Sequence, residues 1–207
     1  KQYVGEAYFF RAYSYFDLLE LYGNAIIVKE PVDVNDPLMK VARNDRSEVA
    51  DLIIDDLNNT IDDLPSNSEL TSDENGRVSK EAAEAFLSRV ALYEGTWQKF
   101  HNNNTTRAKN LLDIAAKAAK SVIDSKQYYL FGTNGDSKVL GDSAYKYMFI
   151  LEDVKSNPAG VVKSANREYI LSRRHDQTLS PIGKNITKEV VNNVQWITRN
   201  FVNLYLC

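Results

Sequence analysis

The chain has 207 residues, which one hydrophobic core can hold, and 43% of them are apolar, an ordinary share for a globular protein. Its net charge of −3 is too small to indicate binding to nucleic acid or to an anionic membrane surface. No apolar run reaches about eighteen residues, so no segment is expected to cross a membrane. The single cysteine, Cys207, excludes an intramolecular disulfide.

The first predicted element is a long helix over residues 3–22. Its apolar residues recur at helical spacing, and Gly23 stands where a C-terminal cap belongs. They fall into two sets on different sides: Val4, Tyr8, Tyr15, Leu18 and Tyr22, and then Phe9, Ala12 and Phe16. A helix that is apolar on more than one face is normally packed between neighbours, so we expect helices on both of its sides.

A loop rich in Pro, Asp and Asn follows, and Asp45 with Glu48 then predicts a capped helix over about 46–64 that Pro65 ends. Its acidic residues lie mostly off the apolar stripe: Asp51, Asp55, Asp56, Asp62 and Asp63. Paired carboxylates can serve glycoside hydrolysis. Adjacent acids on a solvated helix face are the simpler interpretation, so we assign them no catalytic role.

Two more helices are predicted over about 79–100, with Ser79 as N-cap, and about 106–125, with Thr106 as cap. Trp97 could stack on a sugar, but its place near a helix end favours packing between helices. His101 has no metal-spaced partner and is expected to be exposed to solvent. Helices at this spacing are typical of tetratricopeptide-type hairpins, although the strict repeat consensus is absent.

Past residue 130 the composition changes to Gly, Asn and Asp, which is typical of loops. Residues 147–151 and 169–171 are short apolar runs that predict strands.

Several stretches resemble one family when they are taken in chain order. They are Gly5-Glu6-Ala7 to Leu21-Tyr22-Gly23; Asp56-Leu57 through Leu64-Pro65 and Gly76-Arg77 to Ala82-Ala83; Arg89-Val90-Ala91-Leu92-Tyr93 to His101; and Asn166-Arg167-Glu168-Tyr169. Together they resemble the SusD/RagB family of outer-membrane nutrient-binding lipoproteins. Residues 198–205 are similar to a helix of that family, with Ile197 where Pro is usual and Asn203 where Asp is usual.

The resemblance implies a mainly α fold of degenerate tetratricopeptide-like helical hairpins, an α-α superhelix, with loop and short-strand elaborations after residue 130. We expect residues 1–207 to be one SusD-like domain portion. Residues 1–130 would form a helical-repeat layer, and residues 131–207 a loop-rich cap with the start of a further helix. No secretory signal is present, and we interpret the chain as a truncated central portion of a family protein.

The resemblance also implies a function: non-catalytic capture of an oligo- or polysaccharide at the cell surface, and its delivery to a TonB-dependent SusC-like transporter. It implies an outer-membrane lipoprotein of the Bacteroidetes type, held by an N-terminal lipid anchor that these residues lack, because Cys207 lies at the wrong end. No cofactor, metal or nucleic acid is expected. For glycan contacts we nominate Trp196, His175 and Asp176, which lie on a loop or at the start of the last helix.

Two other functions remain open at this stage. One is a helical-repeat scaffold that binds another protein and has no sugar site. The other is an α-helical glycoside hydrolase, for which hydrolysis abolished by Asp176→Asn would be the sign.

Overall fold

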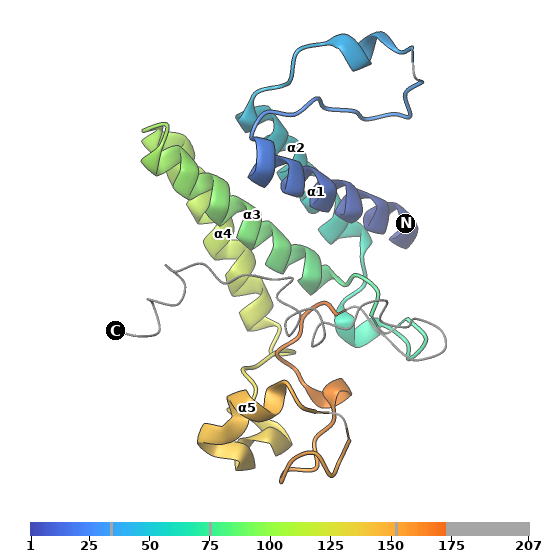
Figure 1. Ribbon diagram of the computed structural model, residues 1–207, viewed down its shortest axis with the longest axis vertical. Helices are drawn as coiled ribbons and strands as arrows, with labels where there is room; N and C mark the ends of the chain where they lie inside the picture. The colour runs from blue at the N-terminus through green and yellow to red at the C-terminus, as the bar shows by residue number, and fades with distance from the viewer. Residues whose placement is uncertain (34, 75, 152, 173–207) are drawn as a thin grey trace, which may run out of the picture. The chain divides into compact units, whose positions relative to one another are not determined.

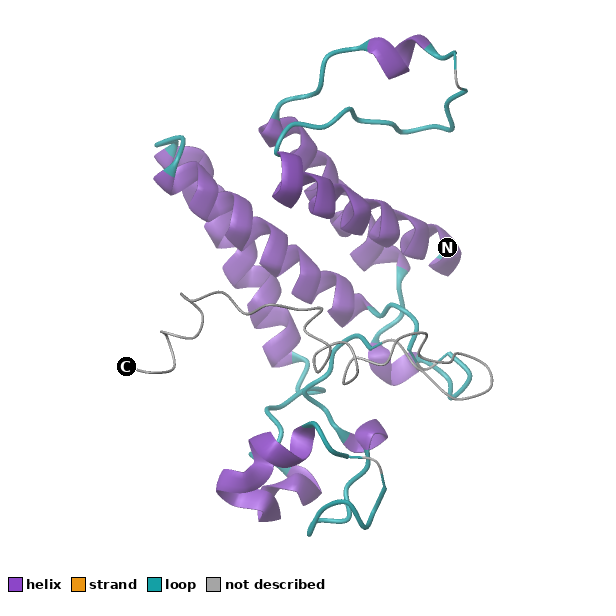
Figure 2. Ribbon diagram, in the orientation of Figure 1, coloured by secondary structure: helices purple, strands orange, loops and turns teal. Residues whose placement is uncertain are grey.

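The structure is a computed structural model that describes residues 1–33, 35–74, 76–151 and 153–172 (Figure 1). Its α-helices are α1 (Gln2–Tyr22), α2 (Arg46–Asp63), α3 (Lys80–Phe100), α4 (Thr105–Asp124) and α5 (Ala144–Met148). Short 3-10 helices are η1 (Pro37–Lys40), η2 (Asn67–Glu69), η3 (Gly135–Ser143) and η4 (Lys163–Ala165). The fold is mainly helical, as predicted, and the described residues contain no strand (Figure 2).

The helix boundaries follow local capping signals. Asp45 accepts from the backbone N–H of Ser47 at 2.8 Å, while Glu48 accepts from the N–H of Asp45 at 3.1 Å, which confirms the predicted capping box of α2. Ser79 caps α3 as predicted, and Gly23 follows α1 with a φ of 72°. The prediction that Thr106 caps α4 was wrong, because Asn104 accepts from the N–H of Arg107 at 3.1 Å.

Helices α1 and α2 form an antiparallel hairpin, which Figure 1 shows as two adjacent ribbons. Near one end the Thr60 hydroxyl donates to the Gly5 carbonyl at 3.1 Å, and further along Arg11 makes a bidentate pair with Asp56, both bonds at 2.7 Å. Asp56 is buried, whereas the sequence had placed it with the acids of a solvated face. Its negative charge is therefore matched inside the hairpin and does not serve solubility.

Helices α3 and α4 form the second hairpin, joined by a short turn. Gly95 brings them close, since an added Cβ there would lie 3.1 Å from side-chain atoms of Leu112. The Ser88 hydroxyl donates to the Ala115 carbonyl at 2.9 Å. Two hairpins with complementary apolar faces are the tetratricopeptide-like arrangement that the sequence predicted.

The main core joins the two hairpins. Phe16 lies edge-on to Phe86 at 5.4 Å and to Tyr93 at 5.5 Å between ring centroids, so α1 contacts α3 as well as α2. Phe9 also meets Phe86, at 5.6 Å. The expectation that α1 has helices on both sides is fulfilled on only one of its faces: Val4, Leu18 and Tyr22 are exposed within the described part of the chain.

A second, smaller core lies in the segment after α4. Its buried members are Phe131, Leu140, Ala144, Met148, Leu151 and Val161. The strands predicted over 147–151 and 169–171 were wrong: the first run is the end of α5 with the residues after it, and the second is bent chain. Buried residues at positions 144, 148 and 151 follow the helical spacing of three and four, which a five-residue apolar run alone does not reveal.

The second core is tied to the chain that follows it. The Glu168 carboxylate accepts from the backbone N–H of Phe131 at 2.8 Å, and Asn166 accepts from the N–H of Glu168 at 2.9 Å. Asn166 and Glu168, from the stretch that resembled the family's Asn-x-Glu segment, therefore fix the backbone at Phe131, where the chain enters this core. The wider prediction of one domain over residues 1–207 stays a prediction, since residues 173–207 lie outside the described part.

Glu81 joins three segments at the start of α3. Its buried carboxylate accepts from the Ser66 hydroxyl at 2.5 Å, the Asn67 backbone N–H at 2.8 Å and the Gln127 amide at 2.8 Å. Burial raises the pKa of Glu81, but the bonds from Ser66 and Asn67 outweigh it and the pKa lies below its ordinary value.

We expect Glu81→Gln to lower the free energy of unfolding at pH 7 by about 2 kcal/mol, because an amide cannot accept all three bonds of the charged carboxylate. Because the pKa of Glu81 is lower in the folded than in the unfolded state, the carboxylate stabilises the folded protein fully at pH values above the unfolded-state pKa of about 4.3. This contribution is lost as the pH falls through the folded-state pKa. Urea unfolding at pH 7 and below pH 4 should therefore show a difference between variant and parent that shrinks in acid. Glu30→Gln, which removes an exposed carboxylate away from this junction, is the control; an equal loss in both variants would contradict the role of Glu81.

Candidate functional site

The glycan-contact residues nominated from the sequence, Trp196, His175 and Asp176, lie outside the described residues. Whether they come together is therefore left to experiment. Two features of the described part are accessible to a ligand: an exposed aromatic pair, Tyr145 on α5 and Phe149 directly after it, and a pocket between α2 and α4.

The aromatic pair is formed by Tyr145 and Phe149, one helical turn apart. Their rings meet edge to face with centroids 5.2 Å apart, and the two residues are 75% and 60% exposed. Aromatic rings this exposed are costly to leave in water and often mark a binding surface. Each ring still presents a face that can pack against an apolar part of a ligand.

The pair is positioned by the second core. Ala144 and Met148 of α5 are buried in that core, and the residue after each, Tyr145 and Phe149, lies about 100° further around the helix axis and is exposed. Gly132 lies directly beneath Ala144, and its backbone N–H donates to the Ser137 hydroxyl at 3.0 Å. The sequence analysis missed the pair because it placed Tyr145 in a loop and Phe149 in a strand over 147–151; the spacing of four between the two aromatics was the available signal.

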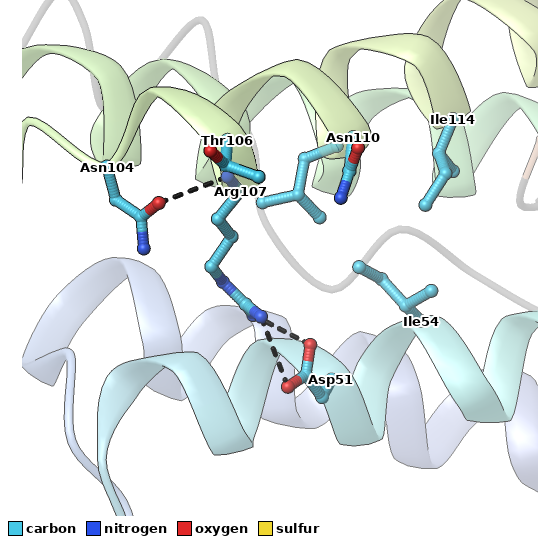
Figure 3. Close-up of a pocket in the computed structure, with 8 residues that line it drawn as sticks. Asp51, Ile54, Asn104, Thr106, Arg107, Asn110 and Ile114 are labelled. Atoms are coloured by element: carbon cyan, nitrogen blue, oxygen red, sulfur yellow. Dashed lines mark hydrogen bonds and ion pairs between the residues drawn. The ribbon is translucent and has the colours of Figure 1, made fainter.

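The pocket lies between α2 and the first turns of α4 and has a volume of about 410 Å³. Its lining residues are Asp51, Ile54, Asn104, Thr106, Arg107, Asn110, Leu111 and Ile114. Figure 3 shows Arg107 extending from α4 to Asp51 on α2, with Ile54 and Ile114 further along the same space.

The charged groups of this pocket are bonded to each other. Arg107 donates to both oxygens of Asp51, at 2.7 and 3.4 Å, and also to the Ser47 carbonyl at 3.1 Å. Asn104 is occupied by capping α4. A ligand would therefore have to compete with existing bonds, and the exposed aromatic pair is the better candidate for binding.

Trp97 packs within the protein. The Arg46 guanidinium lies 4.1 Å from its ring centroid, and the exposed His101 ring stacks on it at 4.2 Å. These contacts agree with the packing role that the sequence favoured over sugar stacking.

The described residues hold no group of three or more His, Cys, Asp and Glu side chains that could bind a metal. Of the acids of α2 considered for hydrolysis, Asp51 is paired with Arg107 and Asp56 with Arg11. None of the helices described is long and apolar enough to span a bilayer.

Comparison with known proteins agrees with this architecture. The SusD-like family model described as "Starch-binding associating with outer membrane" matches residues 1–92, which cover α1, α2 and more than half of α3. A SusD-like protein of Bacteroides ovatus is 30% identical over 123 residues. A crystal structure of a SusD-like protein from Bacteroides fragilis, 24% identical, aligns over 83% of this chain with a TM-score of 0.58. Residues 1–92 of the chain therefore match the SusD-like family model, and the described helices have the fold of SusD-like proteins.

A crystal structure with a xylogluco-oligosaccharide, 26% identical, also aligns over 82% of this chain, with a TM-score of 0.56. The chain spans only part of each relative. The alignments cover 59% of this chain and 20% of the Bacteroides ovatus protein, 27% of the Bacteroides fragilis structure, and 28% of the structure with the oligosaccharide. The aromatic pair of α5 lies beyond the residues that the family model matches.

Proposed function

We propose that this protein acts as a SusD-like protein, which captures an oligo- or polysaccharide at the cell surface without chemical conversion and passes it to a TonB-dependent SusC-like transporter. The match of residues 1–92 to the SusD-like family model carries the proposal, because that model is described as "Starch-binding associating with outer membrane". A structure of similar fold has been determined with a xylogluco-oligosaccharide, which supports an oligosaccharide as the ligand. Anchoring by an N-terminal lipid outside these residues is part of the same proposal.

Within the described residues, we assign the first sugar contact to Tyr145 and Phe149. The C–H groups on one face of a pyranose ring form an apolar surface, and packing that surface on an aromatic ring removes both from water. Two rings set edge to face present two contact planes, which suits consecutive sugar units. Trp196, His175 and Asp176 remain nominated for additional contacts.

Affinity gel electrophoresis of the 207-residue chain against starch, xyloglucan and other soluble polysaccharides tests this function. We expect retardation by at least one polysaccharide. Replacing the pair, Tyr145→Ala with Phe149→Ala, should weaken that binding by about tenfold or more, which corresponds to about 1.4 kcal/mol. Phe100→Ala, which removes an exposed ring at the end of α3, is the control and should leave retardation unchanged.

The outcomes separate the parts of the proposal. Retardation that survives loss of the pair but not Trp196→Ala places the contacts on the residues nominated from the sequence. If neither this chain nor the full polypeptide that carries it is retarded by any polysaccharide, glycan capture is wrong.

A further inference from the structure

The turn that opens the second core contains an asparagine followed by a glycine, Asn134-Gly135. No other asparagine among the described residues has a glycine directly after it. Because glycine lacks a Cβ, its backbone nitrogen can approach the side chain of the preceding residue without steric hindrance. Both residues are exposed, so water and hydroxide ions reach them. These are the conditions under which an asparagine side chain loses its amide group without an enzyme.

The structure holds the two reacting groups next to each other. The Gly135 backbone N–H donates to Oδ1 of Asn134 at 2.8 Å, and that oxygen is bonded to Cγ, the atom that the nitrogen would attack. Gly135 has a φ of 58°, which glycine adopts without steric cost. Closing the ring requires the Asn134 amide to turn its carbonyl carbon toward this nitrogen, a rotation that an exposed side chain makes at little cost.

The reaction needs only water. The Gly135 nitrogen gives up its proton and forms a bond to Cγ of Asn134, while the Cγ–Nδ2 bond breaks and Nδ2 leaves as ammonia with that proton. Water then opens the five-membered imide at one of its two carbonyl carbons. Opening at Cγ leaves aspartate. Opening at the main-chain carbonyl carbon leaves isoaspartate, in which the polypeptide runs through Cβ and Cγ.

Asn134 is connected to the second core through a buried serine. The Ser137 hydroxyl, whose residue is 4% exposed, donates to the Asn134 carbonyl at 2.9 Å and accepts from the Gly132 backbone N–H at 3.0 Å. Gly132 lies against Ala144, the first residue of α5. In isoaspartate the main-chain carbonyl carbon becomes a free carboxylate and one more carbon lengthens the backbone. The bond from Ser137 therefore cannot keep its present geometry.

We propose that Asn134 deamidates spontaneously and that isoaspartate at this position loosens the second core. The buried Ser137 hydroxyl then loses its acceptor, and a buried polar group without a partner destabilises the fold. Through Gly132 the change reaches α5, on which Tyr145 lies and which Phe149 follows. The modification is slow and irreversible, and it does not depend on whether the aromatic pair binds a sugar.

Timed incubation of the 207-residue chain at mildly alkaline pH, followed by tryptic digestion and mass spectrometry, tests the chemical step. Cleavage after Lys126 and Lys138 releases residues 127–138, and synthetic peptides with aspartate or isoaspartate identify the product. The other Asn-Gly, residues 75–76, falls in a different tryptic peptide and is counted separately. We expect conversion at a rate within about threefold of that in the free peptide 127–138. Conversion slower than in the peptide by about tenfold or more would show that the fold protects Asn134 and would overturn the proposal.

Hydrogen exchange of the incubated protein tests the effect on the core. Amides of residues 131–151 should exchange at least about threefold faster in the isoaspartate form, while those of α3 and α4 stay unchanged. Asn134→Ser is the matched control, because serine can cap η3 but has no amide to lose, and it should show neither change after the same incubation. Conversion without faster exchange would refute the effect on the core. Faster exchange in the incubated Asn134→Ser variant would trace the change to another modification.

Discussion

Replacing Arg46 by Met is expected to lower the free energy of unfolding by about 3–5 kcal/mol, because it leaves the buried carboxylate of Glu94 without its counter-charge. Arg46 donates to Glu94 at 2.8 Å, and Glu94 has no exposed surface. After the substitution, only the Gln98 amide, 2.7 Å away, would still bond to that carboxylate. A domain of ordinary stability has about 5–15 kcal/mol in total, so this single change should be visible in any unfolding experiment.

Arg46 also links the three helices of the main core. Its guanidinium donates to the Leu19 carbonyl near the end of α1 at 3.3 Å, and it lies over the rings of Tyr93 and Trp97 on α3. Its backbone N–H, at the start of α2, donates to the Asn24 side chain at 3.1 Å. Loss of the side chain should therefore loosen the junction of α1, α2 and α3 as well as unbalance a charge.

Urea unfolding monitored by circular dichroism measures the loss. The control is Arg107→Met, which breaks a pair with the more exposed Asp51 and should cost less than about 1 kcal/mol. The double variant Arg46→Met with Glu94→Leu removes both charges and should recover much of the stability. A single Arg46→Met variant no less stable than Arg107→Met would show that the buried pair is not what holds the junction.

The helical layer was predictable because its signals are local. Asp45 with Glu48, Ser79, Gly23 and Pro65 each act within one turn of the helix end that they mark, and the structure has helix ends within a few residues of each. Thr106 was chosen wrongly because several residues that can cap a helix follow one another there. The choice of Asn104 depends on the chain reversal before it, where Asn103 has a φ of 54°.

Features that depend on distant partners were not predictable. The burial of Asp56 follows from Arg11, 45 residues earlier in the chain, and no pattern in the sequence pairs them. The aromatic pair could be recognised only in the structure. There α5 is a helix, and its residues Ala144 and Met148 are buried in the second core beside the exposed Tyr145 and Phe149. The exposed side of α1 was not predicted: in the set Val4, Tyr8, Tyr15, Leu18 and Tyr22, Tyr15 is buried while Val4, Leu18 and Tyr22 are exposed.

Replacing Gly132 by Ala should destabilise the second core by about 3 kcal/mol. Gly132 has a φ of 86°, a conformation that costs a residue with a Cβ about 1–2 kcal/mol. The added methyl group would also overlap the Cβ of Ala144, and forced overpacking of this kind costs about 1–3 kcal/mol. Hydrogen exchange should show faster amide exchange over residues 131–151, with α3 and α4 unchanged, because the main core has its own set of buried residues.

Gly160→Ala is the matched control, since its φ is 63° but its nearest atom, the Val154 carbonyl oxygen, is 3.8 Å from the added Cβ. It should cost only the backbone part, about 1 kcal/mol. Gly132→Ala also connects the core to the proposed function, because Ala144 opens the helix that carries Tyr145 and Phe149. If the pair contacts the glycan, Gly132→Ala should reduce retardation in the affinity gel although both rings are still present, and unchanged retardation together with faster exchange would remove the pair from the site.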